Sequence, residues 1–469
     1  MNSLRSICLF LALPACASAQ VKLASSGASN LPSAPVPQSQ SQSTGAGATP
    51  MGQRATAPQN PAGSPSALSL KDAQALALKN NPQISVARLT ALASIQVTRE
   101  ARSNLWPTAS IDLTAVDANP GTRLTAGALN NPTLYQRAAA GAMVTQLITD
   151  FGRTTNLVSS ANLAAKAENQ NALATKEQIL LAVDQAFYNS LQAHAVLTVA
   201  QQTVKERQTV ASQVDALFQS KLKSQLDLSF ANVNLAQAKL LLLDAQNNEN
   251  AALASLSAVL GFSALQSFQL VEDSTPIAPP PGNVDDLITT AFSVRPEILA
   301  FEFQSESAKK FQTAERDLLF PDIRALGVVG VTPVRNPIIS SWYGAVGVNV
   351  NIPVFNGFLY PARSREAALR AQAVQERLRD LRDRISRDVR TSWLNATTAY
   401  DRLAVTQQLL DQANLALKLA QSRYNLGLGS IVELSQAQLQ ETQAQISNAQ
   451  ADYDYRLSLA VLQYQTSGI

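Results

Sequence analysis

Residues 342–357 read WYGAVGVNVNIPVFNG, a strand pattern that leads directly into a very long helix pattern. One series of side chains alternates along this strand with the other, as in a sheet with two different faces. The first series is Trp342, Gly344, Val346, Val348, Val350 and Ile352, and the second is Tyr343, Ala345, Gly347, Asn349 and Asn351. From Ala362 to Leu426 the chain then contains neither proline nor glycine, which predicts a helix of ~95 Å at ~1.5 Å per residue.

A second stretch, from Thr155 to Phe218, is equally free of proline and glycine. Leucines, with a tyrosine at the end of one series, recur at every seventh residue in and after these helix patterns. The two series are Leu403, Leu410, Leu417 and Tyr424, and Leu228, Leu235 and Leu242. A seven-residue repeat predicts a coiled-coil seam, and alanines at the flanking positions allow the helices to approach closely.

The chain contains two internal repeats. One set of residue pairs is offset by 214 positions: Asp72, Ala77, Pro82, Ile84 and Pro107 correspond to Asp286, Ala291, Pro296, Ile298 and Pro321. A later set is offset by 206: Ile179, Val183, Ser224 and Leu228 correspond to Ile385, Val389, Ser430 and Leu434. Each repeat is expected to run as helix, two strands, long helix, tight turn and long helix.

The strands are predicted at about 107–149 in the first repeat and about 321–354 in the second. Strands of about ten residues fit a membrane-spanning β-barrel, but four strands cannot close one. Open sheet edges in lipid would leave backbone groups without hydrogen bonds, so the chain is expected to oligomerise. Three copies would supply about twelve strands.

An aromatic residue stands at the root of each predicted strand, namely Trp106, Phe151, Phe320 and Phe355. At a bilayer interface these side chains would form an aromatic girdle. The alternative is that they are ordinary apolar plugs at the joints between strands and helices.

The composition excludes several classes of function. The 469 residues include one His and two Cys, and the net charge is +3. So few His and Cys residues argue against a zinc enzyme, a thiol enzyme or a Ser-His-Asp hydrolase. The small, dispersed charge argues against nucleic-acid binding. We therefore expect no enzyme activity and no cofactor.

The N-terminal residues 1–19 have the pattern of a signal peptide, with Arg5 before a short apolar run and Ala17-Ser18-Ala19 as the cleavage site. The alternative is a lipoprotein signal that leaves Cys16 acylated. Residues 20–66 carry almost no large apolar side chain and are predicted to be a disordered tether. The two repeats are then expected at 67–264 and 284–469, separated by a proline-rich linker at 265–283. No later segment is apolar for long enough to form a transmembrane helix.

From Leu68 to its C-terminus, the chain resembles the TolC-like outer membrane efflux proteins. The resemblance rests on Leu68-Ser69-Leu70-Lys71-Asp72-Ala73 leading to Asn81-Pro82, on the repeated Pro-strand-strand-Phe-x-Gly unit, and on Tyr424-Asn425-Leu426-Gly427. It implies a mixed α+β membrane protein, a homotrimer whose twelve-stranded outer-membrane β-barrel continues as a coiled-coil α-helical barrel through the periplasm.

The implied function is a passive exit duct for efflux or type I secretion, embedded in outer-membrane lipid. A periplasmic adaptor protein and an inner-membrane transporter would be its partners. The alternative that the residues leave open is a periplasmic coiled-coil scaffold without a pore.

The turns between the paired helices carry the candidate site. Ser224 and Ser430 are placed to cap the returning helices, with Asp227 and Glu433 at the third helical position. By resemblance, the periplasmic gate would comprise Asp227, Tyr424, Glu433 and Gln436. The adaptor-docking tip would comprise Lys221, Lys223, Ser224, Gly427, Gly429 and Ser430. The family's gate arginine falls on Gly429 and its second gate aspartate on Gln436.

The nine arginines between Arg363 and Arg390 alternate with carboxylates. Asp380–Arg384 and Asp383–Arg387 have the spacing of helical ion pairs, so this stretch is interpreted as a solvated helix face. His194 is interpreted as a surface or packing residue.

Overall fold

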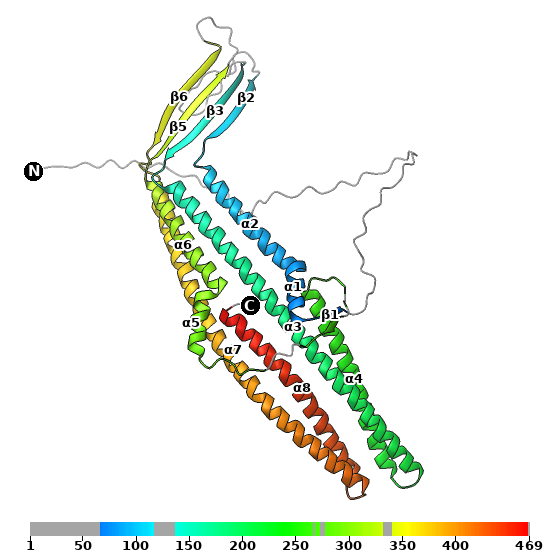
Figure 1. Ribbon diagram of the computed structural model, residues 1–469. Coiled ribbons are helices and arrows are strands. Elements are labelled where there is room, and N and C mark those ends of the chain that lie inside the picture. Colours follow the sequence, from blue (N-terminus) through cyan, green and yellow to red (C-terminus); the bar gives the residue numbers. More distant parts are fainter. Residues whose placement is uncertain are drawn as a thin grey trace, which may run out of the picture. The chain divides into compact units, whose positions relative to one another are not determined.

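The computed structural model describes residues 66–116, 137–264, 266, 268–272, 277–331 and 340–467. The predicted signal peptide, Cys16 and tether residues 20–65 lie outside this part. The described residues belong to one compact unit, Gly63–Ile469 (Figure 1). None of its described helices is both long enough and apolar enough to cross a bilayer.

The two repeats have the element order that the sequence predicts (Figure 1). The first comprises α1 Leu70–Asn80, α2 Pro82–Ser103, β2 Thr108–Val116, β3 Arg137–Thr149, α3 Arg153–Gln219 and α4 Gln225–Val259. The second comprises α5 Val284–Val294, α6 Pro296–Arg316, the 3₁₀ turn η1 Asp317–Leu319, β5 Asp322–Val331, β6 Trp342–Asn351, α7 Leu359–Asn425 and α8 Ile431–Ser467.

In each repeat, the first predicted helix is divided in two by a proline. Pro82 and Pro296 are the first residues of α2 and α6. The residues before them, Asn81 and Arg295, are extended, because the proline ring disfavours helical backbone at the preceding position. The Asn81 side chain also accepts a hydrogen bond from the backbone of Gln83 at 2.9 Å, which caps α2.

The four long strands form one antiparallel sheet in the order β2-β3-β5-β6. The two repeats join through β3 and β5, where Ala140 pairs with Val331 and Val144 with Gly327. Strands β2 and β6 are therefore the two edges of the sheet. Strand β3 spans Arg137–Thr149 and so lies at the end of the region where the sequence predicts the first pair of strands, although its own alternation is weak.

The register gives the sheet two different faces. The described charged side chains Asp112, Asp322 and Arg324 lie on one face, with Asn349 and Asn351. The opposite face is apolar except for Gln146 near the strand root. Its larger exposed side chains include Ile111, Leu113, Val144, Val329, Val331, Trp342, Val346, Val348 and Val350. These apolar side chains are uncovered in the single chain, Val346 by 92% and Ile111 by 77%.

The long helices pack as two pairs, α3 with α4 and α7 with α8, and α3 also contacts α8. Small residues recur at the buried positions of these seams, namely Ala231, Ala238 and Ala245 on α4, and Thr406, Ala413 and Ala420 on α7. Val214 of α3 and Leu434 of α8 are larger and at least as deeply buried, at 1% and 0% exposed. The predicted leucines Leu403, Leu410 and Leu417 are only half-buried. Small side chains therefore set the close spacing, and the leucines flank them.

Two short strands were not predicted. Strand β1, Ser66–Leu68, pairs in parallel with β4, Phe268–Leu270. Ser66, which the sequence analysis included in the tether, is thus the first residue of a strand, and β4 lies within the predicted linker at 265–283. The proline-rich part of that segment is held by α7, since the Trp393 indole donates to the carbonyl of Pro281 at 2.6 Å.

Helix α1 docks on α3 through a buried carboxylate. The Gln74 side-chain amide donates to Asp184 at 2.6 Å, and Asp184 is 4% exposed. Burial raises the pKa of Asp184 from 3.8 to about 6, although the bond from Gln74 opposes this. The folded chain thus binds a proton at Asp184 more tightly than the unfolded chain does.

We predict that Asp184 makes stability pH-dependent. Its contribution is present below the ordinary carboxyl pKa and is lost as pH rises through about 6. Asp184→Asn should therefore stabilise the protein relative to wild type at pH 7.5 and lose that advantage at pH 4.5. Thermal unfolding at both pH values measures this. Asp411→Asn, at an exposed position on α7, is the control, and an identical pH dependence in wild type and Asp184→Asn would contradict the prediction.

Candidate functional site

The turns that end α3 and α7 have the same backbone structure. Both are Schellman turns: Leu222 donates to the Leu217 carbonyl at 2.8 Å, and Leu428 donates to the Arg423 carbonyl at 2.8 Å. The residue before each donor is left-handed, with φ of 59° at Lys221 and 74° at Gly427. The second turn uses glycine at this position, whereas the first holds a lysine in a conformation that is unfavourable for a side chain.

At the first turn, Ser224 and Asp227 form a complete capping box. The Asp227 amide donates to Ser224 Oγ at 3.2 Å, and the Asp227 carboxylate accepts from the Ser224 amide at 3.0 Å and from its hydroxyl at 2.6 Å. Burial opposes ionisation, but these bonds and the nearby Lys223 lower the pKa of Asp227 on balance. Asp227 is thus a stably charged carboxylate at this tip.

The second turn has only half of the predicted capping box. The Glu433 amide donates to Ser430 Oγ at 3.1 Å, but the Glu433 carboxylate forms an ion pair with Arg423 at 3.0 Å instead of returning to the cap. A Cβ at Gly429 would lie 3.2 Å from both Arg423 Cβ and Glu433 Oε2. Arg423 therefore occupies the space beside the position where the family's arginine was expected.

Sequence reasoning missed Arg423, although it directly precedes Tyr424. Its guanidinium also donates to the Leu428 carbonyl at 3.3 Å, so it braces the turn as well as pairing with Glu433. Gln436 is exposed on α8.

Tyr424 lies between the two tips. It is 4% exposed and belongs to an apolar cluster from all four long helices that includes Val214, Leu235 and Leu434. The Lys223 ammonium lies 3.8 Å from the centre of its ring, a cation–π distance. The Tyr424 hydroxyl is buried without a hydrogen-bond partner among the described residues, so it forms no bond to Asp227 although both were assigned to the gate. Burial first, and the Asp227 charge second, raise the pKa of Tyr424.

The tips also expose apolar side chains that sequence reasoning missed. Leu222 and Leu428 occupy equivalent places in the two turns and are 71% and 70% exposed. Leu226 and Val432, also equivalent, project from the first turns of α4 and α8. The end of each helix pair therefore presents leucine beside charged residues.

The four predicted girdle residues are all exposed: Trp106 by 68%, Phe151 by 54%, Phe320 by 49% and Phe355 by 77%. The rings of Phe151 and Phe320 lie 5.9 Å apart. Phe358, which was not predicted, packs edge-on against Phe355 at 5.7 Å. Their exposure argues against apolar plugs within one chain.

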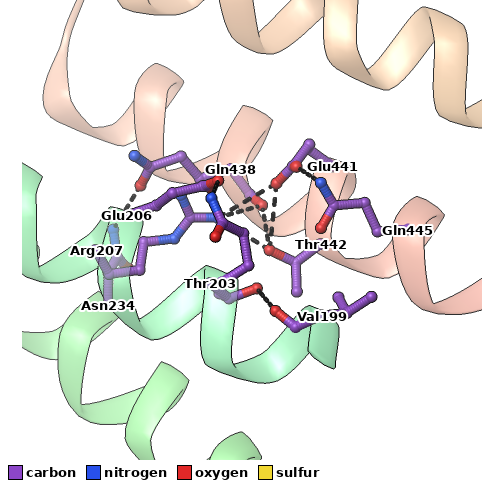
Figure 2. A network of polar contacts seen from close by, with 10 residues as sticks. Val199, Thr203, Glu206, Arg207, Asn234, Gln438, Glu441, Thr442 and Gln445 are labelled. Carbon is purple, nitrogen blue, oxygen red and sulfur yellow. Dashed lines mark hydrogen bonds and ion pairs between the residues drawn. The ribbon is translucent and has the colours of Figure 1, made fainter. Parts of the chain in front are cut away.

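A buried polar network links the two helix pairs (Figure 2). Arg207 on α3 donates to the Gln438 carbonyl at 2.8 Å and to the Thr442 hydroxyl at 2.9 Å, both on α8. Its guanidinium lies 3.6 Å from the Glu441 carboxylate, and both residues are at most 5% exposed. Asn234 of α4 donates to Ser435 at 2.7 Å in the same region.

Burial disfavours the charged forms of both Arg207 and Glu441. Burial lowers the pKa of Arg207 despite the attraction of Glu441 and Glu206. Burial, followed by repulsion from Glu206, raises the pKa of Glu441 despite the attraction of Arg207. The ion pair therefore does not fully offset the cost of desolvation. Sequence spacing could not have revealed it, because Arg207 and Glu441 belong to different repeats.

The signals that the sequence analysis discounted lie on the surface. The predicted Asp380–Arg384 pair forms at 2.7 Å, but the predicted Asp383–Arg387 pair is wrong, since Arg387 contacts its neighbour Asp388 at 2.7 Å. His194 pairs with Glu249 at 2.6 Å and is 66% exposed. Within the described ranges, no three His, Cys, Asp or Glu side chains are grouped so that they could hold a metal ion.

Comparison with known proteins gives a family match and structural relatives. The family model for outer membrane efflux protein matches residues 62–262 and 287–465. A search of curated protein sequences found no match. Three solved structures share the fold, each aligned over 85% of this chain.

The first is a membrane protein from Pseudomonas aeruginosa, 22% identical over 93% of its chain, with a TM-score of 0.75. The second is the CmeC outer membrane channel of Campylobacter jejuni, 17% identical over 85% of its chain, with a TM-score of 0.75. The third is the open state of the MtrE outer membrane channel of Neisseria gonorrhoeae, 19% identical over 89% of its chain, with a TM-score of 0.71.

Lys221→Gly should make the first turn more stable, because glycine removes the steric cost of the left-handed backbone at this position. A gain of about 1 kcal/mol would slow amide exchange at the turn about fivefold. Gly427→Ala should do the reverse at the second turn. Hydrogen–deuterium exchange of peptides covering both turns measures these effects, and faster exchange in Lys221→Gly would contradict the prediction.

The Arg207–Glu441 pair should be strongly coupled. Arg207→Met or Glu441→Leu alone leaves one charge buried without its partner and should cost about 3–5 kcal/mol. The double substitution should cost clearly less than the two single changes combined, because it removes both buried charges. Thermal unfolding of wild type, the two single variants and the double variant in detergent measures this coupling. Additive effects would show that the two side chains act independently.

Proposed function

The chain belongs to the outer membrane efflux protein family, and we propose that three copies of it enclose one duct whose entrance is formed by the two helix tips. It is an outer-membrane exit duct of tripartite efflux systems and not an enzyme. It lies in the outer membrane and extends into the periplasm.

The observation that carries the proposal is the two-faced, open-edged sheet. Its apolar face is uncovered, and its other face carries Asp112, Asp322 and Arg324. A barrel wall needs lipid on the first face and water on the second. The edges β2 and β6 need partners, which further copies supply. A scaffold without a pore gives no reason for such a sheet.

Three copies give about twelve strands, matching the expected barrel. The strand roots, with Trp106, Phe151, Phe320 and Phe355, then stand at the periplasmic membrane interface as an aromatic girdle. Helices α3, α4, α7 and α8 continue the duct away from the membrane, and their turns lie at the far end.

Asp227 and Glu433 bring about six carboxylates to this far end in three copies. Such a ring concentrates cations and disfavours anions. Arg423 reduces the negative charge of the ring by pairing with Glu433, and Gln436 adds no charge to it. Tyr424 belongs to the apolar cluster and its ring also contacts the Lys223 ammonium, so it links the two tips of one chain. These residues form the gate in our proposal.

The docking tip comprises Lys221, Lys223, Ser224, Gly427, Gly429 and Ser430, together with Leu222 and Leu428. The exposed leucines are suited to insert into an apolar groove of a periplasmic adaptor, while the lysines contact its acidic side chains. An inner-membrane transporter would deliver substrate through that adaptor.

Ion selectivity tests the gate. Glu433→Gln removes a carboxylate and also frees Arg423, so cation selectivity should fall. Gln436→Glu adds a carboxylate one turn further along α8 and should raise it. Asp227→Ala should increase the resting conductance and cost about 1 kcal/mol through loss of the helix cap. Reversal potentials in planar bilayers measure the selectivity.

Glu376→Gln is the matched control, since this exposed carboxylate lies on α7 far from the tip. If wild type forms no channel, the duct itself is refuted. If it conducts but Glu433→Gln and Gln436→Glu leave the selectivity unchanged, only the gate assignment is refuted.

A further inference from the structure

Exposed arginines accompany the aromatic residues on the helix side of the sheet. Arg102 lies near the end of α2, four residues before Trp106, and Arg316 ends α6, four residues before Phe320. Arg365 lies in the second turn of α7, shortly after Phe358. All three arginines are exposed, Arg316 by 64%. We call these three residues the arginine rim.

We propose that the arginine rim binds the phosphate groups of anionic phospholipids in the inner leaflet of the outer membrane. The inference rests on the proposed placement of the helices in the periplasm, which puts the rim just below the membrane. Lipopolysaccharide occupies the outer leaflet and is therefore not the expected ligand. The guanidinium group suits this role because its donors match the oxygens of a phosphate.

The carboxylates near the rim are mostly engaged elsewhere. Glu315 is buried and pairs with Arg363 at 2.7 Å, and Asp317 is buried and accepts from Asn156 at 2.9 Å. Glu366 pairs with Arg370 at 2.5 Å. Among the described carboxylates, none forms an ion pair with Arg102 or Arg365, whereas Arg316 forms an ion pair of 3.7 Å with Asp317. Positive charge therefore stays available to a ligand at Arg102 and Arg365, and Arg316 is 64% exposed beside its buried partner.

Some nearby charges do not belong to the rim. Glu100, exposed on α2, offsets part of the charge of Arg99 and Arg102. Arg153, which follows Phe151, is half-buried and its Nε is inaccessible to solvent. It therefore packs within the chain at the junction of β3 and α3 and is not part of the rim. The rim is thus confined to the roots of β2, β5 and α7.

The aromatic side chains complete an amphipathic site. Trp106, Phe320 and Phe358 are 68%, 49% and 72% exposed and can lie among acyl chains at the level of the ester groups. Arg102 and Arg316 lie four residues, about one helical turn, from Trp106 and Phe320, and Arg365 lies seven residues, about two turns, from Phe358. The long arginine side chains can therefore reach the phosphates. A zwitterionic headgroup also has a phosphate, but its ammonium group weakens the attraction, so charge selects anionic lipid.

The experiment uses the full-length protein in detergent and counts bound lipids by native mass spectrometry. Phosphatidylglycerol and phosphatidylcholine are added separately. Wild type should bind phosphatidylglycerol preferentially, and the preference should fall about fivefold for each rim arginine changed to Gln. Arg377→Gln and Arg379→Gln, further along α7, are the matched controls and should leave the preference unchanged.

Two further measurements keep the test valid if a variant with several rim arginines changed to Gln does not fold. Phosphatidylglycerol binding to wild type should weaken as salt rises, and Arg365→Lys should retain more of it than Arg365→Gln. Equal binding of both lipids by wild type, or an undiminished preference in the rim variants, would overturn the proposal. Channel conductance of the same variants in phosphatidylcholine bilayers tests the duct separately, because it does not depend on anionic lipid.

Discussion

The constraint on which this structure depends is that every backbone amide and carbonyl in a membrane must be hydrogen-bonded within the protein. The sheet satisfies this inside one chain only at the three interfaces among β2, β3, β5 and β6. The outer edges of β2 and β6 can be satisfied only by other copies. Because the two repeats lie in one chain and pair through β3 and β5, each chain has two open sheet edges, whereas two separate repeats would have four.

The long helices extend the duct without a large apolar core. Alanine and threonine recur at buried positions of the seams, so the helices approach closely and bury backbone and small side chains. Specific pairing then depends on a few polar contacts, above all the Arg207–Glu441 network between the repeats. A buried ion pair formed at a desolvation cost stabilises little. We infer that this pair instead favours one register of the two helix pairs, because a shifted register would separate the two buried charges.

The two tips show how an internal repeat diverges at a functional end. Both keep the Schellman turn and the serine cap, because these meet the hydrogen-bonding needs of the helix ends. They differ in side-chain chemistry: Asp227 is tied into its cap, whereas Glu433 is shared with Arg423. In three copies, Asp227 and Glu433 would therefore alternate around the proposed entrance, the first bonded to its helix cap and the second paired with an arginine. The two turns also differ at the left-handed position, which is Lys221 in one and Gly427 in the other.

The sequence by itself determined the repeats, the strands, the long helices and the caps at Ser224 and Ser430, because these follow from local periodicity and from short-range bonding. Only the tertiary structure decided that Arg423 takes the Glu433 carboxylate, that Tyr424 meets Lys223 instead of bonding to Asp227, and that β1 pairs with β4. The Arg207–Glu441 pair likewise depends on how α3 lies against α8. Contacts between residues distant in sequence depend on packing geometry, which local periodicity does not encode.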